Sequence, residues 1–353
     1  MKLEHIETPA LILDLDVMEA NMQTMNQLLA GSNIRLRPHY KSHKCTTLAH
    51  MQIAAGAKGI TCAKLSEAED LILSGIEDVL IANQVVHPAK IARLAYLAKC
   101  CHLSVCVDNA QNIADLQNAA ALQGSTIYCL VEFDIGMSRC GIFTHEQAYE
   151  LAAQITACPN LEFEGIQAYA GNLAHEFDYA NRRDGSEDIK QRLSALKQYL
   201  ENRDIPVKEI SGISTGTVQF HAHDSVYTEI QSGSYLLGDT TYEAVGVDFK
   251  HALFVLASVM HKHDHAVITD AGLKTVSVDQ NPPVFQGYEQ YPVSMSEEHS
   301  AIYGENLPLE IGDHMLMIPS HCCTEMNLHN HIYFVRKGSV VDRVPITSRG
   351  KSL

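Results

Sequence analysis

Short apolar runs alternate with longer amphipathic segments between about residue 34 and residue 235 of the chain. Eight of the short runs are rich in β-branched residues and have the length of β-strands. They are Ile34–Arg37, Lys58–Thr61, Asp78–Ala82, Leu103–Val107, Thr126–Phe133, Leu161–Tyr169, Val207–Ser211 and Tyr227–Gln231. Helical patterns lie between most of them and are clearest at Lys64–Leu73 and Asp188–Leu200. The segment after Ser211 lacks this periodicity and predicts a loop with a brief helix.

Strands separated by helices require right-handed crossovers, which produce a parallel sheet. Eight such units in about 200 residues match a (β/α)8 barrel. An open doubly wound sheet is the alternative. We favour the barrel because it uses all eight predicted strands.

The pattern changes after about residue 246, where strand-like runs follow one another without long helices between them. These runs are Ala252–Met260, Ala266–Asp270, Asp313–Ile318, His331–Val335 and Ser339–Val344. Prolines at 282, 283, 292 and 308 interrupt the loops. We therefore predict an α/β fold with two domains. Residues 15–245 form a TIM-type (β/α)8 barrel, and residues 246–353, joined by about residues 1–14, form a mainly β domain.

Net charge limits the kinds of partner that the protein can bind, and cysteine usage indicates its compartment. The chain has 42 acidic and 26 basic residues and a formal net charge of −16, which argues against nucleic acid or an anionic membrane as partner. The longest apolar run, Ala252–Met260, is too short to span a membrane, and the first residues lack a signal-peptide pattern. We therefore expect a cytoplasmic protein whose ten cysteines are reduced.

We look for candidate catalytic and binding residues just after the predicted strands, because barrel enzymes place their active residues at the carboxyl ends of the strands. The loops after the seventh and eighth strands, Gly212–Thr217 and Ser232–Tyr235, combine glycines with hydroxyl side chains. Such loops bind phosphate in many barrels, although a plain turn is the alternative for either loop alone. Lys41 follows the first strand and could supply a Schiff-base amine, the alternative being a surface lysine. A phosphate site together with an amine suggests pyridoxal phosphate.

A second kind of site is suggested by His321 and Cys323, which lie two residues apart just past a predicted strand. On an extended segment they project to the same side, and imidazole and thiolate both suit Zn²⁺. The alternative is a structural cysteine beside a surface histidine. The cluster His261–His265 lies between two predicted strands, and a solvated hairpin turn explains it better than a metal site.

Several motifs, taken together and in order, resemble one enzyme family. They are Thr8–Leu11, Arg37–Lys44, Lys64–Glu69, Asp134–Gly141, Gln167–Tyr169, Ser214–Thr217, Tyr227–Tyr235, Asp270–Lys274, Glu297–His299 and His321–His329. With these the chain resembles, over nearly its whole length, the D-threonine aldolase and D-serine dehydratase group of fold-type III pyridoxal phosphate enzymes. These enzymes are relatives of alanine racemase.

The resemblance implies roles for individual residues and a homodimer with an alanine-racemase-like barrel and a C-terminal β domain. Lys41 matches the lysine that holds pyridoxal 5'-phosphate as a Schiff base. Arg139 matches the arginine that bonds the phenolic oxygen of the cofactor, and Tyr169 matches a tyrosine that contacts the cofactor. His175 matches a histidine near the substrate hydroxyl. The phosphate-binding positions are Thr215, Gly216, Thr217, Gly233, Ser234 and Tyr235.

The resemblance also makes His321 and Cys323 ligands of a divalent metal, most simply Zn²⁺, with Mn²⁺ as the alternative. Two signals disagree about the reaction. Aldolases of this group carry His-x-Asp at the metal site and the dehydratases carry His-x-Cys, as here, whereas the barrel motifs are more similar to the aldolase branch. We expect a lyase that cleaves β-hydroxy-D-amino acids to glycine and an aldehyde, like D-threonine aldolase.

The alternative within this class is a dehydratase of D-serine or D-threo-3-hydroxyaspartate, which releases ammonia and a 2-oxo acid. An amino-acid racemase would need a second base opposite Lys41 and no metal pair. A pyridoxal phosphate carrier would lack the C-terminal β domain that this sequence predicts. Both are therefore less favoured.

Overall fold

The computed structural model describes residues 2–353 and divides into two compact units. The barrel unit comprises Leu28–Lys41, Leu48–Gly233 and Lys351–Leu353. The β unit comprises residues 2–27, Ser42–Thr47 and Ser234–Gly350. Because the units are assembled from several segments of chain, the domain limits 15–245 and 246–353 stay a prediction.

The barrel unit is built on eight parallel strands in the order β2-β9-β8-β7-β6-β5-β4-β3. The strands are β2 (Arg35–Leu36), β3 (Ile60–Cys62), β4 (Asp78–Gln84), β5 (His102–Val107), β6 (Ile127–Glu132), β7 (Leu161–Ala168), β8 (Glu209–Gly212) and β9 (Glu229–Ile230). The two ends of this order also meet, because His39 forms a parallel bridge with Thr61 and the Lys58 amide donates to the Leu36 carbonyl at 2.8 Å. The predicted barrel is confirmed, and the open sheet is not formed.

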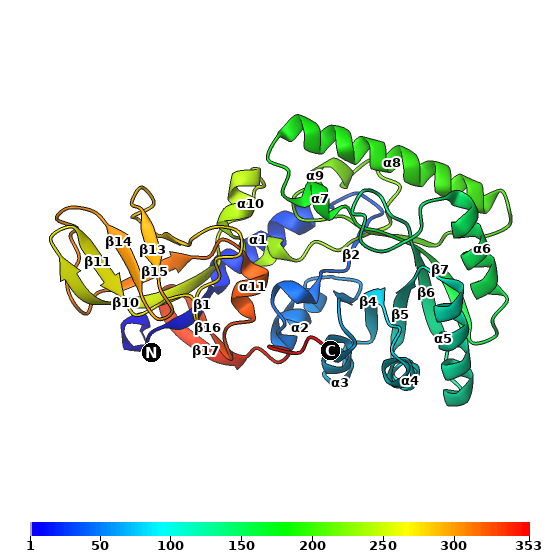
Figure 1. The fold of residues 1–353 in the computed structure, drawn as a ribbon, viewed down its shortest axis with the longest axis horizontal. Coiled ribbons are helices and arrows are strands. Elements are labelled where there is room, and N and C mark those ends of the chain that lie inside the picture. Colours follow the sequence, from blue (N-terminus) through cyan, green and yellow to red (C-terminus); the bar gives the residue numbers. More distant parts are fainter. Residues whose placement is uncertain (1) are drawn as a thin grey trace. The chain divides into compact units, whose positions relative to one another are not determined.

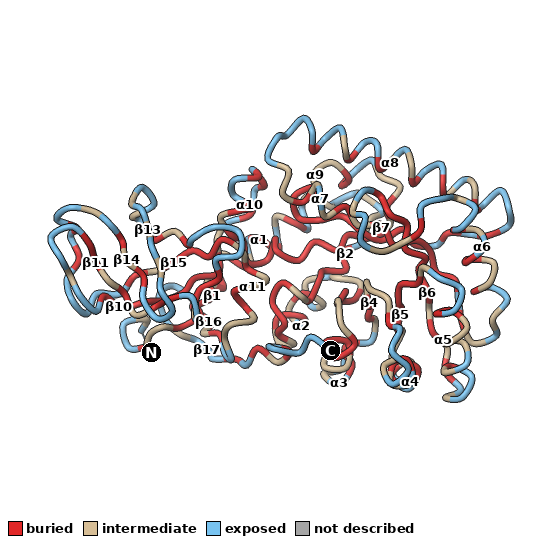
Figure 2. Tube along the Cα trace, viewed as in Figure 1, coloured by how far each residue is buried: buried red, intermediate tan, exposed pale blue. Residues whose placement is uncertain are grey.

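Helices cover the outside of this sheet (Figure 1). They are α2 (Thr46–Ala54), α3 (Leu65–Leu73), α4 (Pro88–Leu97), α5 (Ala110–Gln123), α6 (His145–Thr156), α7 (Gly171–Ala174), α8 (Tyr179–Glu201) and α9 (Val218–His221). Helix α3 buries Leu65, Ala68 and Leu71 at helical spacing. Figure 2 shows the same division in the barrel unit, with strands buried and the outer helix surfaces exposed. Helix α9 is the brief helix predicted after Ser211.

A network of charged side chains gathers where several barrel strands begin. The Arg37 guanidinium lies 3.2 Å from a Glu229 carboxylate oxygen and 2.6 Å from an Asp78 carboxylate oxygen. The Lys58 ammonium joins Glu229 at 2.8 Å to Glu209 at 2.6 Å. Because β4, β8 and β9 begin at or beside these carboxylates, the network lies at the amino ends of the parallel strands. It is thus at the end of the barrel where catalytic residues are not found.

The β unit contains a nine-stranded sheet with the main order β13-β14-β11-β10-β1-β16-β17, and β15 pairs with β10 and β12. The strands are β1 (Ala10–Asp14), β10 (Leu253–His263), β11 (Ala266–Thr269), β12 (Val284–Phe285), β13 (Val293–Met295), β14 (Ser300–Tyr303), β15 (His314–Ile318), β16 (His331–Arg336) and β17 (Ser339–Pro345). Its helices are α1 (Leu15–Leu28), α10 (Thr240–Val245) and α11 (Cys322–Met326). Short 3-10 helices occur at Leu3–His5, Tyr40–Ser42 and Ser234–Leu236. The mainly β character predicted for this part is confirmed.

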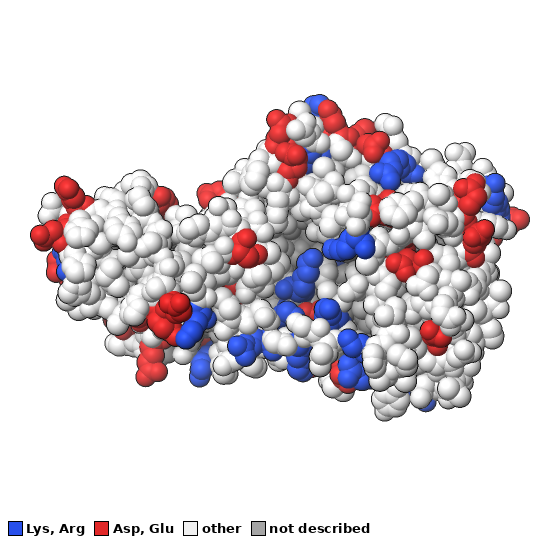
Figure 3. Space-filling view, viewed as in Figure 1, with Lys and Arg blue, Asp and Glu red and all other residues white. Residues whose placement is uncertain are grey.

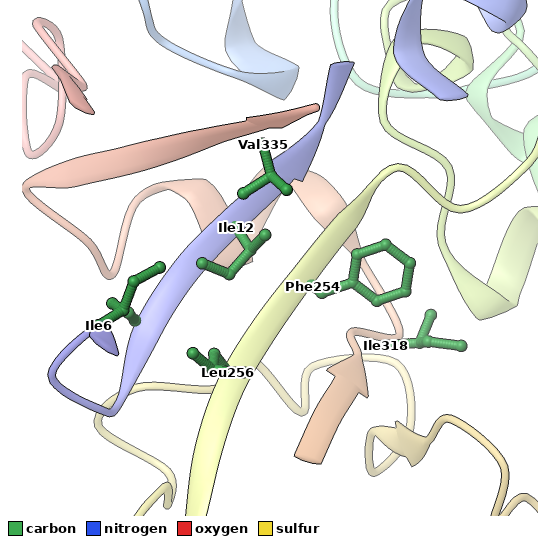
Figure 4. Close-up of a cluster of buried hydrophobic side chains, with 7 residues drawn as sticks. Ile6, Ile12, Phe254, Leu256, Ile318 and Val335 are labelled. Atoms are coloured by element: carbon green, nitrogen blue, oxygen red, sulfur yellow. The ribbon is translucent and has the colours of Figure 1, made fainter. Parts of the chain in front are cut away.

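Strand β1 lies inside this sheet, antiparallel to β10 and parallel to β16. Its apolar residues join side chains from β10 and β16 in one buried cluster (Figure 4). Ile12, Phe254 and Leu256 are each at most 7% exposed. The N-terminal strand therefore holds together segments from the far end of the sequence.

Three smaller expectations concern histidines, membranes and cysteines. Strands β10 and β11 form an antiparallel hairpin whose turn is Asp264 and His265, so the His261–His265 cluster is the predicted exposed hairpin. None of the helices formed by residues 2–353 is long and apolar enough to cross a membrane. None of the ten cysteines, all of which lie among residues 2–353, forms a disulfide.

Candidate active site

A cavity of about 160 Å³ opens in the barrel unit where the parallel strands end. Its wall is made by residues that end or follow β2, β3, β4, β6, β7 and β9. The lining residues are His39, Lys41, Ala63, Ala82, Asn83, Arg139, Cys140, Gln167, Tyr169 and Gln231. The structure thus brings together three residues predicted from the sequence, Lys41, Arg139 and Tyr169.

Lys41 is carried by the 3-10 helix Tyr40–Ser42, which begins four residues after the end of β2. Its backbone N–H donates to His39 Nδ1 at 3.3 Å. Its ammonium nitrogen lies 5.4 Å from the centre of the Tyr169 ring, and the side chain is half-buried. An amine placed over an aromatic face at the cavity wall has a defined position from which it can react with a carbonyl group.

Two buried glutamines form part of the cavity wall. Gln231 Nε2 donates to Gln167 Oε1 at 2.7 Å and to Ser211 Oγ at 2.8 Å, which fixes the orientation of both amides. Gln231, Asn83 and His39 were not singled out from the sequence. His39 and Gln231 lie in the motifs Arg37–Lys44 and Tyr227–Tyr235, although no role was predicted for them. Asn83 directly follows the predicted strand Asp78–Ala82, and the end of that strand was not considered.

Arg139 lies in the loop between β6 and α6. The Gly136 N–H donates to Asp134 Oδ1 at 2.7 Å, and Ser138 has a φ of 50°, so the loop turns tightly before the arginine. A Cβ on Gly141 would come within 2.9 Å of the Glu132 carbonyl, which explains a glycine there. Burial raises the pKa of Glu132, against the opposing effects of its Gln84 hydrogen bond and the Arg139 charge. Arg139 itself is exposed and lines the cavity.

The loop after β8 contains three of the predicted phosphate-binding residues. Ile213 opens it with a φ of 68°, a left-handed conformation that is strained for a β-branched residue. Thr215, Gly216 and Thr217 follow and are buried. A Cβ on Gly216 would lie 2.1 Å from the Ala174 carbonyl, so only glycine allows this close approach.

The second predicted phosphate segment follows β9. The Ser232 hydroxyl is buried and has no hydrogen-bond partner among residues 2–353. Gly233 is buried beside it, and Ser234 and Tyr235 begin the next 3-10 helix. An orphaned buried hydroxyl next to a glycine offers a donor to an anionic oxygen. This donor set fits the phosphate of pyridoxal phosphate.

If the β8 loop binds that phosphate, replacing Gly216 by alanine should weaken cofactor binding at least about tenfold. The added methyl would have to displace backbone, because its nearest neighbour is the Ala174 carbonyl. Titration of apoprotein with pyridoxal 5'-phosphate, followed by absorbance, measures the effect. Gly31→Asn is the matched control, because a Cβ there meets nothing within 4 Å and asparagine tolerates its φ of 78°. Unchanged affinity in the Gly216 variant would remove this loop from the cofactor site.

His175 ends the short helix α7, which follows Tyr169 on the loop after β7. It is half-buried. Its predicted role near the substrate hydroxyl stays a prediction, as do the roles of the other site residues.

The predicted metal ligands lie in the β unit at the start of α11. His321 is the residue preceding this helix, and its Nδ1 lies 2.7 Å from Asp279 Oδ2. Burial lowers the pKa of His321, but contacts with Cys323 and Asp279 outweigh burial and raise it to about 9. Burial likewise raises the pKa of Asp279, but hydrogen bonds from Ser277, Thr324 and His321 lower it to about 2.

This arrangement fits a metal ligand pair. The Asp279 carboxylate faces Nδ1 of His321, and the Cys323 thiol contacts the same imidazole, so imidazole and thiol lie where one metal could bind both. Among residues 2–353 no group of three or more His, Cys, Asp or Glu could hold a metal ion, so the pair would need water or substrate to complete coordination. Asp279 was missed by sequence reasoning, because it lies in an irregular loop far from the His-x-Cys motif.

Charge is unevenly distributed over the surface. On the face shown in Figure 3, Lys and Arg side chains gather over α2 and α3, whereas acidic side chains are scattered elsewhere. The local sign is thus opposite to the net charge of −16. A small anionic ligand is attracted to such a region even when the whole protein is acidic.

Comparison with protein families and solved structures agrees with this architecture. The alanine racemase N-terminal domain matches residues 13–241, and a serine dehydratase domain matches residues 252–335. A D-threonine aldolase from Filomicrobium marinum superposes with a TM-score of 0.97 at 35% identity, covering 100% of this chain and 98% of that chain. The chain belongs to the family of D-threonine aldolases and D-serine dehydratases, fold-type III pyridoxal phosphate enzymes with the fold of alanine racemase.

Within this family the chain is similar to aldolases along nearly its whole length. A D-threonine aldolase from Arthrobacter is 39% identical, over 99% of this chain and 94% of the relative. A 3-hydroxy-D-aspartate aldolase from Paracoccus denitrificans is 37% identical, over 98% and 93%. A D-threo-3-hydroxyaspartate dehydratase from Delftia is 30% identical over 78% of this chain and 74% of its own. The dehydratase is thus the more distant relative.

Proposed function

We propose that this chain is an aldolase, dependent on pyridoxal phosphate and a divalent metal, that cleaves β-hydroxy-D-amino acids to glycine and an aldehyde. The observation that carries the proposal is the near full-length similarity to two aldolases, which exceeds that to the dehydratase. The cavity with Lys41, Arg139 and Tyr169 supports it. A homodimer in the cytoplasm is part of the same proposal.

Each predicted residue has a distinct task in this reaction. Lys41 would hold the cofactor through its amine, and that amine can afterwards return a proton to the substrate carbon. Arg139 and Tyr169 would orient the cofactor ring, and the two glycine-containing loops would bind its phosphate. His175 takes the proton of the β-hydroxyl group as the Cα–Cβ bond breaks. The cofactor, when bound, supplies an acceptor for the electron pair of that bond.

His321 and Cys323 would hold the metal, with Zn²⁺ favoured because thiolate is a soft ligand and Mn²⁺ as the alternative. A metal there supplies a Lewis acid for the β-hydroxyl oxygen of the substrate. Recognition of the substrate's β-hydroxyl group is then what distinguishes this enzyme from a racemase.

Dehydration is the second candidate, and Cys323 is the observation that favours it. The dehydratases of the family carry His-x-Cys where the aldolases carry His-x-Asp, and residues 252–335 match the serine dehydratase domain. The products are ammonia and a 2-oxo acid. A single ligand can change independently of the rest of the chain, so the near full-length similarity weighs more.

Product analysis decides between the two reactions. The holoenzyme is incubated with D-threonine, D-serine and both D-configured 3-hydroxyaspartates, and the products are separated by chromatography. We expect glycine with acetaldehyde from D-threonine, or glycine with glyoxylate from a hydroxyaspartate. A chelator should stop both, and added Zn²⁺ or Mn²⁺ should restore them. A predominance of ammonia with 2-oxobutyrate, pyruvate and oxaloacetate from the respective substrates would overturn the aldolase assignment. Inversion at Cα without cleavage would overturn both the aldolase and the dehydratase assignment.

A further inference from the structure

A chain of hydrogen bonds in the β unit leads away from His321 into the interior. Its first link is Asp279, whose Oδ2 lies 2.7 Å from His321 Nδ1. The other oxygen, Oδ1, accepts hydrogen bonds from Ser277 Oγ and Thr324 Oγ1, both at 2.6 Å. The Asp279 side chain is 37% exposed, so these two donors are what keeps it facing His321.

The second link is Glu325, on α11. Its side chain is 0% exposed, and a carboxylate this deeply buried requires donors on its oxygens. The backbone N–H of Ser277 donates to Glu325 Oε2 at 2.7 Å. This bond ties α11 to the backbone two residues before Asp279.

The third link is His329, which lies four residues after Glu325 and past the end of α11. Its Nε2 lies 3.0 Å from Glu325 Oε1 and 2.8 Å from the Thr275 carbonyl oxygen. Both neighbours are acceptors, so Nε2 must carry a hydrogen. His329 therefore connects Glu325 to the start of the same loop, and the loop is held at residues 275 and 277.

We propose that Asp279 positions His321 as a metal ligand, and that Glu325 and His329 hold the loop that presents Asp279. This inference rests on the proposed metal role of His321. A carboxylate on Nδ1 fixes both the tautomer and the plane of the imidazole, which directs Nε2 to the metal. Asp279, Glu325 and His329 are thus positioning residues that act through His321.

The test uses Co²⁺ as the probe on the holoenzyme, because a thiolate ligand gives an absorption band that a histidine-only site does not. The band therefore detects Co²⁺ bound to Cys323 and does not arise from Co²⁺ bound to the exposed His261–His265 hairpin. Titrations are compared for the wild-type protein, Asp279→Asn and His329→Gln. Asp264→Asn and His331→Gln are the matched controls, because both residues are exposed in the same unit.

We expect Asp279→Asn to weaken Co²⁺ binding about 10- to 100-fold and His329→Gln about tenfold, with both controls unchanged. The d–d bands of bound Co²⁺ should shift in Asp279→Asn while the thiolate band remains, which a purely structural role would not produce. Ser277→Ala removes only the hydroxyl contact to Asp279 and should also weaken Co²⁺ binding. This variant replaces His329→Gln in the test if His329→Gln does not fold.

Wild-type affinity and d–d bands in Asp279→Asn would overturn this inference and leave the metal site standing. Wild-type affinity in both His329→Gln and Ser277→Ala would overturn the part played by the loop. Absence of the thiolate band in the wild-type protein would overturn the metal role of Cys323, and this inference with it. The two failures are therefore distinguishable.

Discussion

Replacing Lys41 by alanine should reduce turnover on the order of 10³-fold or more while leaving the fold intact. The ammonium lies in the cavity wall over Tyr169, where it makes little contribution to core packing. Its loss removes both the amine that holds the cofactor and the group that moves the substrate proton. Turnover is measured by glycine release, and folding by circular dichroism.

Two control variants distinguish a covalent role of Lys41 from an electrostatic one. Lys41→Arg keeps the positive charge but lacks a primary amine, so it should be as inactive as the alanine variant. Lys208→Ala changes an exposed lysine of the same unit and should retain activity. Reduction of the wild-type holoenzyme with borohydride should attach the cofactor to the peptide containing Lys41. Attachment to a different lysine would contradict the assignment.

Replacing Arg37 by methionine should cost about 3–5 kcal/mol of the free energy of unfolding. The guanidinium is 1% exposed and lies against Glu229, which is also 1% exposed, so the substitution leaves a buried carboxylate with fewer partners. Burial raises the pKa of Asp78, and the Arg37 charge opposes that rise, so Asp78 loses a stabilising neighbour as well. Urea unfolding curves give the free energy.

Arg35→Met is the matched control, two residues earlier in the chain. The Arg35 side chain is 52% exposed, so its ion pair with Glu209 is screened by water and should contribute less than about 1 kcal/mol. Equal losses in the two variants would show that burial does not determine the strength of this network. Activity per folded molecule should stay near wild type in both, because the network lies at the amino ends of the strands.

Local patterns predicted much of the barrel. Strand runs and helical spacing depend on neighbouring residues, so the eight strands and helix α3 could be read directly. Lys41 could be placed at the mouth of the barrel because the carboxyl ends of parallel strands meet at one end of a barrel, whereas the roles of Arg139 and Tyr169 came from the resemblance to the family.

Features that depend on distant pairing could not be read in this way. The bridge between His39 and Thr61 that closes the barrel has no local signal. Asp279 reaches His321 only because an irregular loop folds back against α11, and no periodicity describes such a loop. The left-handed φ of Ile213 runs against the preference of a β-branched residue, so its sequence predicts the opposite. Tertiary context decides each of these cases.

The position of β1 inside its sheet has a consequence for biosynthesis. Ile12 is synthesised about 320 residues before Tyr333, one of its sheet partners. At 5–20 residues per second, synthesis of the intervening chain takes on the order of 15–60 s. Until β10 is made, about 240 residues after it, the apolar segment Ala10–Leu13 has neither neighbouring strand to pair with, so we expect chaperones to bind it and nascent chains to associate through it. Chaperone co-expression should therefore raise the soluble yield of the protein.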